Sequence, residues 1–148
     1  MTKAERAGLL TYFNALSGAV HNSFWLDING RLYFNKAPQG TLLSNGPYAT
    51  FFVVVDSNDD TFTEEIRDIQ VQFSLFSGNS SADQILDMDE HLTSLLNRKS
   101  YTISGARVTM LRQQGEGPIL SKDSDGSDIA DEYWQTDIDY LFMIQPIS

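Results

Sequence analysis

The chain has 148 residues, a net charge of −10 and no cysteine, so disulfides, thiolate nucleophiles and cysteine-based zinc sites are excluded. This length suits one domain, residues 1–148, with a core large enough to fold without a metal. No apolar run approaches the ~20 residues of a membrane-spanning helix, and no signal peptide precedes the first helical pattern. We therefore expect synthesis in the cytoplasm and no membrane partner.

The charge is unevenly distributed along the chain. Residues 1–36 contain four basic and two acidic residues, a net charge of +2, which leaves −12 on residues 37–148. A nucleic-acid-binding protein would show a basic stripe, and we find none. Acidity keeps a small protein soluble, and it would also suit a surface that DNA passes without adhering.

The first predicted element is a helix. Thr2 and Glu5 have the spacing of a capping box, in which the hydroxyl and the carboxylate each accept a hydrogen bond from a free backbone N–H. Leu9, Phe13 and the apolar residues that follow recur at helical spacing. We expect this helix to end between Leu16 and Val20.

A short hairpin is expected next. Residues 24–28 have the composition of a short strand or an irregular edge, Asn29-Gly30 is a strong turn signal, and Arg31 to Phe34 follows as a strand. Residues 37–47 contain two prolines and two glycines, which is typical of a loop.

Two further strands are predicted in the middle of the chain. Tyr48 to Val55 is a continuous apolar run, too short for a typical helix and rich in β-branched and aromatic residues. The acidic residues 56–60 are expected to end it. Residues 67–76 then alternate, with Ile69, Val71, Phe73 and Leu75 on one face, which predicts a strand with one wet side. The simplest pairing of the two is an antiparallel hairpin.

The last part combines a helix with strands. Ser81 and Gln84 repeat the capping-box spacing, and apolar residues then recur at helical spacing to about Asn97. Residues 106–113 and 133–145 are predicted strands. Between them lies a long acidic loop, residues 115–132, and connections above ~12 residues are usually functional or disordered. We expect this loop to be solvated and mobile.

The predicted order is therefore α-β-β-β-α-β-β. Two amphipathic helices can cover one face of an antiparallel sheet. The sequence thus predicts an α+β domain with a mainly antiparallel sheet of four to five strands and two helices packed on one face.

One segment resembles a metal site. Asp123 and Asp125 match ligand positions of a calcium loop that would span residues 121–132, and Glu132 falls where a bidentate carboxylate belongs. Ser121, however, occupies the first position, where an Asp is expected, and no helix pattern leads in. These residues are weak metal candidates, and a solvated loop is the alternative interpretation.

The sequence shows little sign of catalytic, metal-binding or cofactor-binding motifs elsewhere. The acidic cluster of residues 56–65 is typical of a solvated hairpin tip, and His21 and His91 have no partner at metal-ligand spacing. The sequence contains no nucleophile elbow, no phosphate-binding loop and no dinucleotide fingerprint. We therefore expect no enzymatic activity and no cofactor.

In this order, the elements resemble the tail terminator and tail-completion (head–tail joining) proteins of long-tailed bacteriophages. The resemblance covers nearly the whole chain. It rests on an N-terminal helix followed by these segments: Gly30-Arg31-Leu32-Tyr33, Gly46-Pro47-Tyr48, Phe51 to Val55, Ile69 to Phe76, Ser77-Gly78-Asn79-Ser80, Ala82 to Leu96, Arg107 to Arg112 and Trp134 to Ile144. Residues 115–132 form a longer and more acidic loop than this pattern needs.

The resemblance implies a structural virion protein. Such proteins form a ring, commonly a hexamer, on the head-proximal end of the tail tube, where they stop tube growth and present the surface that docks onto the head connector. The implied partners are other copies of the chain, the tail tube protein and the connector or stopper protein, while DNA passes through without specific binding. The resemblance implies no catalytic residues.

In a ring, one patch on each subunit meets a different patch on the next. Hairpin tips and loops are plausible contact surfaces, and the candidate interface residues are Asp56, Asp59, Asp60, Glu64, Glu65, Asp123, Asp125 and Asp128. Two alternatives stay open, namely another neck or head–tail adaptor protein and, from a different class, a small calcium-binding module using residues 121–132.

Overall fold

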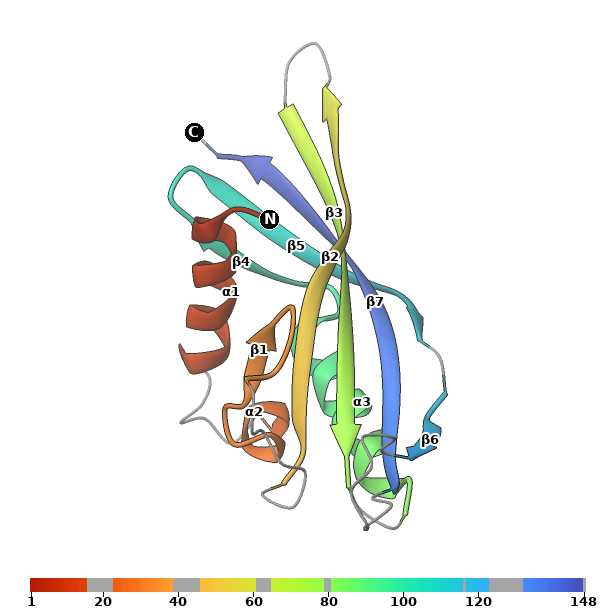
Figure 1. Cartoon of the computed structure of the whole chain (residues 1–148). Helices are drawn as coiled ribbons and strands as arrows, with labels where there is room; N and C mark the ends of the chain where they lie inside the picture. Colours follow the sequence, from red (N-terminus) through yellow and green to blue (C-terminus); the bar gives the residue numbers. More distant parts are fainter. Residues whose placement is uncertain are drawn as a thin grey trace.

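The computed structural model describes residues 1–15, 23–38, 46–60, 65–78, 81–115, 117–122 and 132–147. Within them, three helices pack against a curled sheet (Figure 1). The helices are α1 (Lys3–Ala15), α2 (Ser23–Asp27) and α3 (Asp83–Leu96). The strands are β1 (Leu32–Phe34), β2 (Tyr48–Asp60), β3 (Glu65–Ser77), β4 (Lys99–Ile103), β5 (Ala106–Gly115), β6 (Ile119–Lys122) and β7 (Glu132–Pro146).

The sheet has seven strands in the order β1-β2-β3-β7-β5-β4, with β6 also paired to β7. All pairings are antiparallel except β1–β2, which is parallel. The α+β class is therefore confirmed, whereas the prediction of four to five strands and two helices is wrong. Because the strands twist, the sheet curls into a half-barrel with the helices on its inner side (Figure 1).

Helix α1 begins as the sequence predicts. The backbone N–H of Thr2 donates to the Glu5 carboxylate at 2.8 Å, and the Glu5 N–H donates to the Thr2 hydroxyl at 3.1 Å, which is the reciprocal capping box. The predicted end of the helix, between Leu16 and Val20, lies outside the described residues.

The prediction of a hairpin around Asn29-Gly30 is wrong. Residues 23–27 form helix α2, and the chain then turns through Asn29 and Gly30, which both adopt positive φ. Strand β1 pairs with β2 in parallel instead, with Leu32 opposite Ala49. Five residues are too few for periodicity to distinguish a helical turn from a strand.

The β2–β3 hairpin is confirmed and is longer than predicted. Residues 56–60, expected to end the first strand, continue β2 and pair with β3 down to Asp60 opposite Glu65. A β-bulge interrupts the register, since Val53 pairs with Val71 but Val55 pairs with Gln70. The hairpin extends past the rest of the sheet at the top of Figure 1.

Helix α3 ends where the sequence predicts, but its start differs from the predicted capping box. Its N-cap is Ala82, which makes no side-chain cap, and the Ser81 hydroxyl accepts from the Asp83 N–H at 3.2 Å. Gln84 instead accepts a hydrogen bond from the Ser77 hydroxyl at the end of β3. The side chain that should close the box is therefore used to join the helix to the sheet.

Two short strands lie where none was predicted. Strand β4 pairs with β5 through a turn at Gly105, and β6 lies inside the range expected to be a loop, with Lys122 opposite Glu132 of β7. Residues 116 and 123–131 of that predicted loop lie outside the described residues.

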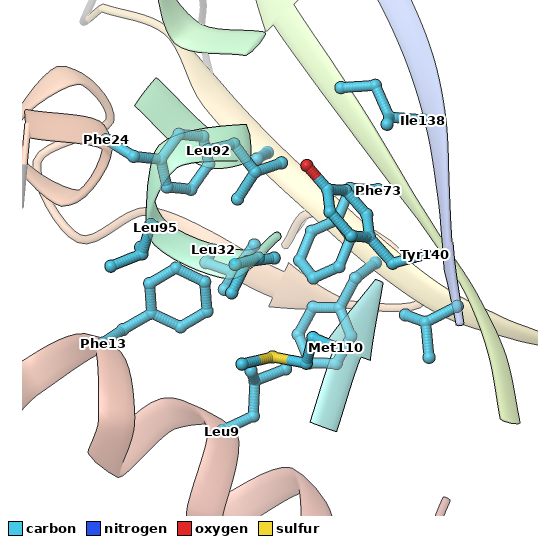
Figure 2. Close-up of a cluster of buried hydrophobic side chains, with 14 of the residues drawn as sticks. Leu9, Phe13, Phe24, Leu32, Phe73, Leu92, Leu95, Met110, Ile138 and Tyr140 are labelled. Atoms are coloured by element: carbon cyan, nitrogen blue, oxygen red, sulfur yellow. The ribbon is translucent and has the colours of Figure 1, made fainter. Parts of the chain in front are cut away.

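The core lies between the helices and the inner face of the sheet (Figure 2). The predicted inward face of β3 is confirmed, because Ile69, Val71, Phe73 and Leu75 are fully buried. Alternate residues of β7 share that face and are buried from Thr136 to Ile144. Among the described helices, none is long and apolar enough to cross a membrane.

Candidate assembly surfaces

The first surface is the far part of the β2–β3 hairpin, residues 56–60 and 65–68, which we call the acidic tip. Its five acidic residues and one arginine give a net charge of −4. It contains four of the predicted interface residues, Asp56, Asp59, Asp60 and Glu65. The structure describes only the backbone of the last three, and Glu64 lies outside the described residues.

Asp56 anchors the base of this tip. Its carboxylate accepts two hydrogen bonds from Arg67, at 2.8 and 2.7 Å, and one from the amino group of Met1 at 3.0 Å. The Arg67 guanidinium holds the pKa of Asp56 well below its usual range. Arg67 also donates to Glu5, a buried carboxylate in the first turn of α1. The hairpin and the first helix are thus tied by one guanidinium.

The β-bulge places two apolar side chains outside the core. Asp56 lies opposite buried Ile69 and so shares the inner face, whereas Val55 lies opposite Gln70 on the outer face. Val54 and Val55 are 45% and 49% exposed. Strand β1 pairs only with Ala49 to Phe51, so beyond Phe51 the outer edge of β2 has no partner strand within the described part of the chain. An open strand edge with exposed valines is typical of an interaction surface.

A second surface lies on the other flank of the sheet. Residues 98–107, which we call the basic hairpin, contain Arg98, Lys99 and Arg107 and no acidic residue, a net charge of +3. All three side chains are exposed. Strand β4 ends the strand order at this side. A comparison of charge between large segments of the chain hides this surface, although its three basic residues are visible in the sequence.

The outer face of the central strands carries a hydrogen-bonded polar row. The Ser74 hydroxyl donates to Asp137 at 2.7 Å, and the Gln72 amide donates to Asp139 at 3.2 Å. Gln135 donates a second hydrogen bond to Asp137 at 3.1 Å. These side chains hydrogen-bond to one another, so the row is a polar, acidic part of the outer face.

The predicted calcium loop is only partly described. Ser121 and Lys122 belong to β6 and Glu132 begins β7, so strands flank the loop where a calcium loop of this type has helices. Asp123, Asp125 and Asp128 lie outside the described residues, and their roles in metal binding or in an interface stay predictions.

The sequence predicts no partner at metal-ligand spacing for either histidine. His91 in fact lies 2.6 Å from the carboxylate of Asp27, so it joins α3 to the end of α2, while His21 lies outside the described residues. No group of three or more acidic or histidine side chains that could hold a metal occurs among the described residues.

Comparison with known proteins gives a match in three-dimensional structure and none in sequence. No protein family and no curated protein sequence matches this chain. A solved structure described as the virion of a native gene transfer agent particle contains a chain that matches with a TM-score of 0.62 and 13% sequence identity, covering 97% of this chain and 99% of that chain. The two chains therefore share a fold over nearly their whole lengths.

Proposed function

We propose that this chain is a structural virion protein that forms a ring at the head-proximal end of a phage-type tail tube. In this role it ends tube growth and provides the docking surface for the head connector. The observation that carries the proposal is the end-to-end fold match with a virion chain, which covers 97% of this chain and 99% of that chain. The order of elements, which resembles tail terminators, supports the finer assignment.

The described residues agree with a binding role. Their polar side-chain contacts join secondary-structure elements to one another, as in the pair of Arg67 with Glu5 and that of His91 with Asp27. The outer face of the sheet adds an acidic row with Asp137 and Asp139. An acidic surface disfavours adhesion of DNA, which suits a ring that DNA passes through.

The test is removal of the chain from cells that produce the particle, followed by electron microscopy. A terminator leaves headless tails of abnormal and variable length, because nothing stops the tube. An adaptor between tail and connector leaves headless tails of normal length, and this outcome would move the chain to the alternative neck role. Normal, complete particles would refute both.

A further inference from the structure

The acidic tip and the basic hairpin flank the same end of the sheet. The C-terminal part of β7 runs between them, with Ile144 opposite Arg67 of β3 on one side and Pro146 opposite Ala106 of β5 on the other. Figure 1 shows the two projecting hairpins at the upper end of the molecule, on either side of the C-terminal strand. The chain segments with net charges of −4 and +3 therefore lie on opposite flanks at the same end of the sheet.

Both flanks are open for contact within the described residues. The outer edge of β2 is unpaired beyond Phe51, and Val54 and Val55 are exposed beside it. On the opposite flank, β4 has a partner only on its β5 side, and Lys99 and Thr102 are exposed. Each flank thus combines an unpaired strand edge with charge of one sign.

We propose that the acidic tip of one copy docks against the basic hairpin of the next copy. The inference rests on the proposed ring function and names its subunit contact. Two equal patches facing each other would place acid against acid, so the charges favour the heterologous contact that builds rings. Because the two patches lie at the same end of the sheet and on opposite flanks, repeated contacts place subunits side by side instead of stacking them.

Charge reversal on either flank tests this contact. The acid-reversed chain carries Asp59→Lys and Asp60→Lys, and the base-reversed chain carries Lys99→Glu and Arg107→Glu. Matched controls change the charge at exposed positions elsewhere, with Asp87→Lys and Glu90→Lys in α3, and with Lys36→Glu, which is compared with the single variant Lys99→Glu. Circular dichroism and thermal unfolding verify that each variant folds.

The readout is the number of copies per purified particle, measured by quantitative mass spectrometry in cells where each variant replaces the natural chain. The acid-reversed tip has a net charge of 0 and the base-reversed hairpin a net charge of −1, so one variant loses the attraction between the flanks and the other turns it into repulsion. Each reversed chain should therefore lose at least about tenfold in incorporation, while the controls incorporate normally. Reversed chains that incorporate as well as their controls would overturn the proposal.

Co-expression of the two reversed chains identifies the partner. The acid-reversed chain keeps its +3 hairpin and the base-reversed chain keeps its −4 tip. Alternating copies therefore regain the attractive contact at every second interface, and incorporation should recover, with the two chains in a 1:1 ratio. Without rescue, the flanks contact a different virion protein and the proposed contact is wrong, although the ring function stands. Absence of the unmodified chain from purified particles would instead refute the proposed function and the contact with it.

Discussion

Asp56 and Arg67 form a two-point ion pair across the β2–β3 hairpin, with Nε of Arg67 2.8 Å from Oδ1 and a terminal guanidinium nitrogen 2.7 Å from Oδ2. The fork of Arg67 matches a carboxylate at two points, which fixes its direction. Its remaining terminal nitrogen reaches Glu5 of α1. The base of the projecting hairpin therefore has a defined orientation relative to the first helix.

Loss of Arg67 should be more costly than loss of Asp56. Arg67→Ala leaves the buried Glu5 carboxylate without its charged donor, and we expect unfolding free energy to fall by about 2–3 kcal/mol. Asp56→Asn should cost at most about 1 kcal/mol, because that pair is partly exposed and screened. Urea unfolding followed by circular dichroism measures both, and equal losses would argue against the bridging role of Arg67.

The same pair predicts a dependence on pH. Because Arg67 lowers the pKa of Asp56 from its ordinary 3.8, the pair stabilises the fold above that value and loses its effect as the pH falls below about 4. The difference in unfolding free energy between the natural chain and Asp56→Asn should be constant near neutral pH and shrink below about pH 4. In an Arg67→Ala background this pH dependence should be much smaller.

Gly8 should resist replacement although it lies within a helix. A Cβ at Gly8 would lie 2.9 Å from Cε2 of Tyr101 and closer still to Cγ2 of Ile103, so α1 could not keep its approach to β4. Gly→Ala normally favours a helix by about 1 kcal/mol, but here we expect a loss of about 1–3 kcal/mol from overpacking. The loss should shrink in an Ile103→Ala background, and a gain in stability on Gly8→Ala would contradict the close approach.

Neighbouring residues of β3 should respond very differently to truncation. Phe73 is fully buried, and its ring centroid lies 5.7 Å from that of Phe51 and 5.5 Å from that of Tyr140. Phe73→Ala should cost about 3–5 kcal/mol. Gln72→Ala removes one hydrogen bond on the outer face and should cost under about 1 kcal/mol. Similar losses in thermal unfolding would mean that the two faces are assigned wrongly.

Calcium should not change the thermal stability of the protein. Strands flank residues 123–131, and the first position of the presumed loop is Ser121, so the geometry of a helix-flanked calcium site is missing. We expect the same melting temperature in millimolar calcium and in chelator. A calcium-dependent rise that disappears in Asp125→Ala would restore the calcium-binding alternative.

The elements that could be predicted from sequence are those with strong, long patterns. The alternation of β3, the buried face of β7 and the helical spacing of α3 each extend over many residues, so their inward faces follow from periodicity. Elements that depend on a distant partner could not be predicted this way. Strand β1 is three residues long and exists through its parallel pairing with β2, and β6 exists through its pairing with β7.

The candidate surfaces could be predicted only in part. The acidic residues of the tip are evident in the sequence, but the extension of β2 to Asp60 depends on cross-strand pairing that outweighs the low strand propensity of Asp. One signal was available: Arg67 stands two residues before Ile69 on the apolar face of an alternating strand. A cation on that face requires an acidic partner, and the structure supplies Asp56 and Glu5.

The bulge at Val54 changes which face of the sheet the side chains of the hairpin occupy, with little effect on the length of the hairpin. Residues inserted in pairs would lengthen the arm and leave every side chain on its present side, whereas a single residue inverts the phase of everything beyond it. The extra residue in β2 is what turns Asp56 toward the first helix and leaves Val54 and Val55 on the open side. If β2 were one residue shorter here, the hairpin would have nearly the same length. The residues beyond the deletion would change faces, so Asp56 would no longer point toward the first helix.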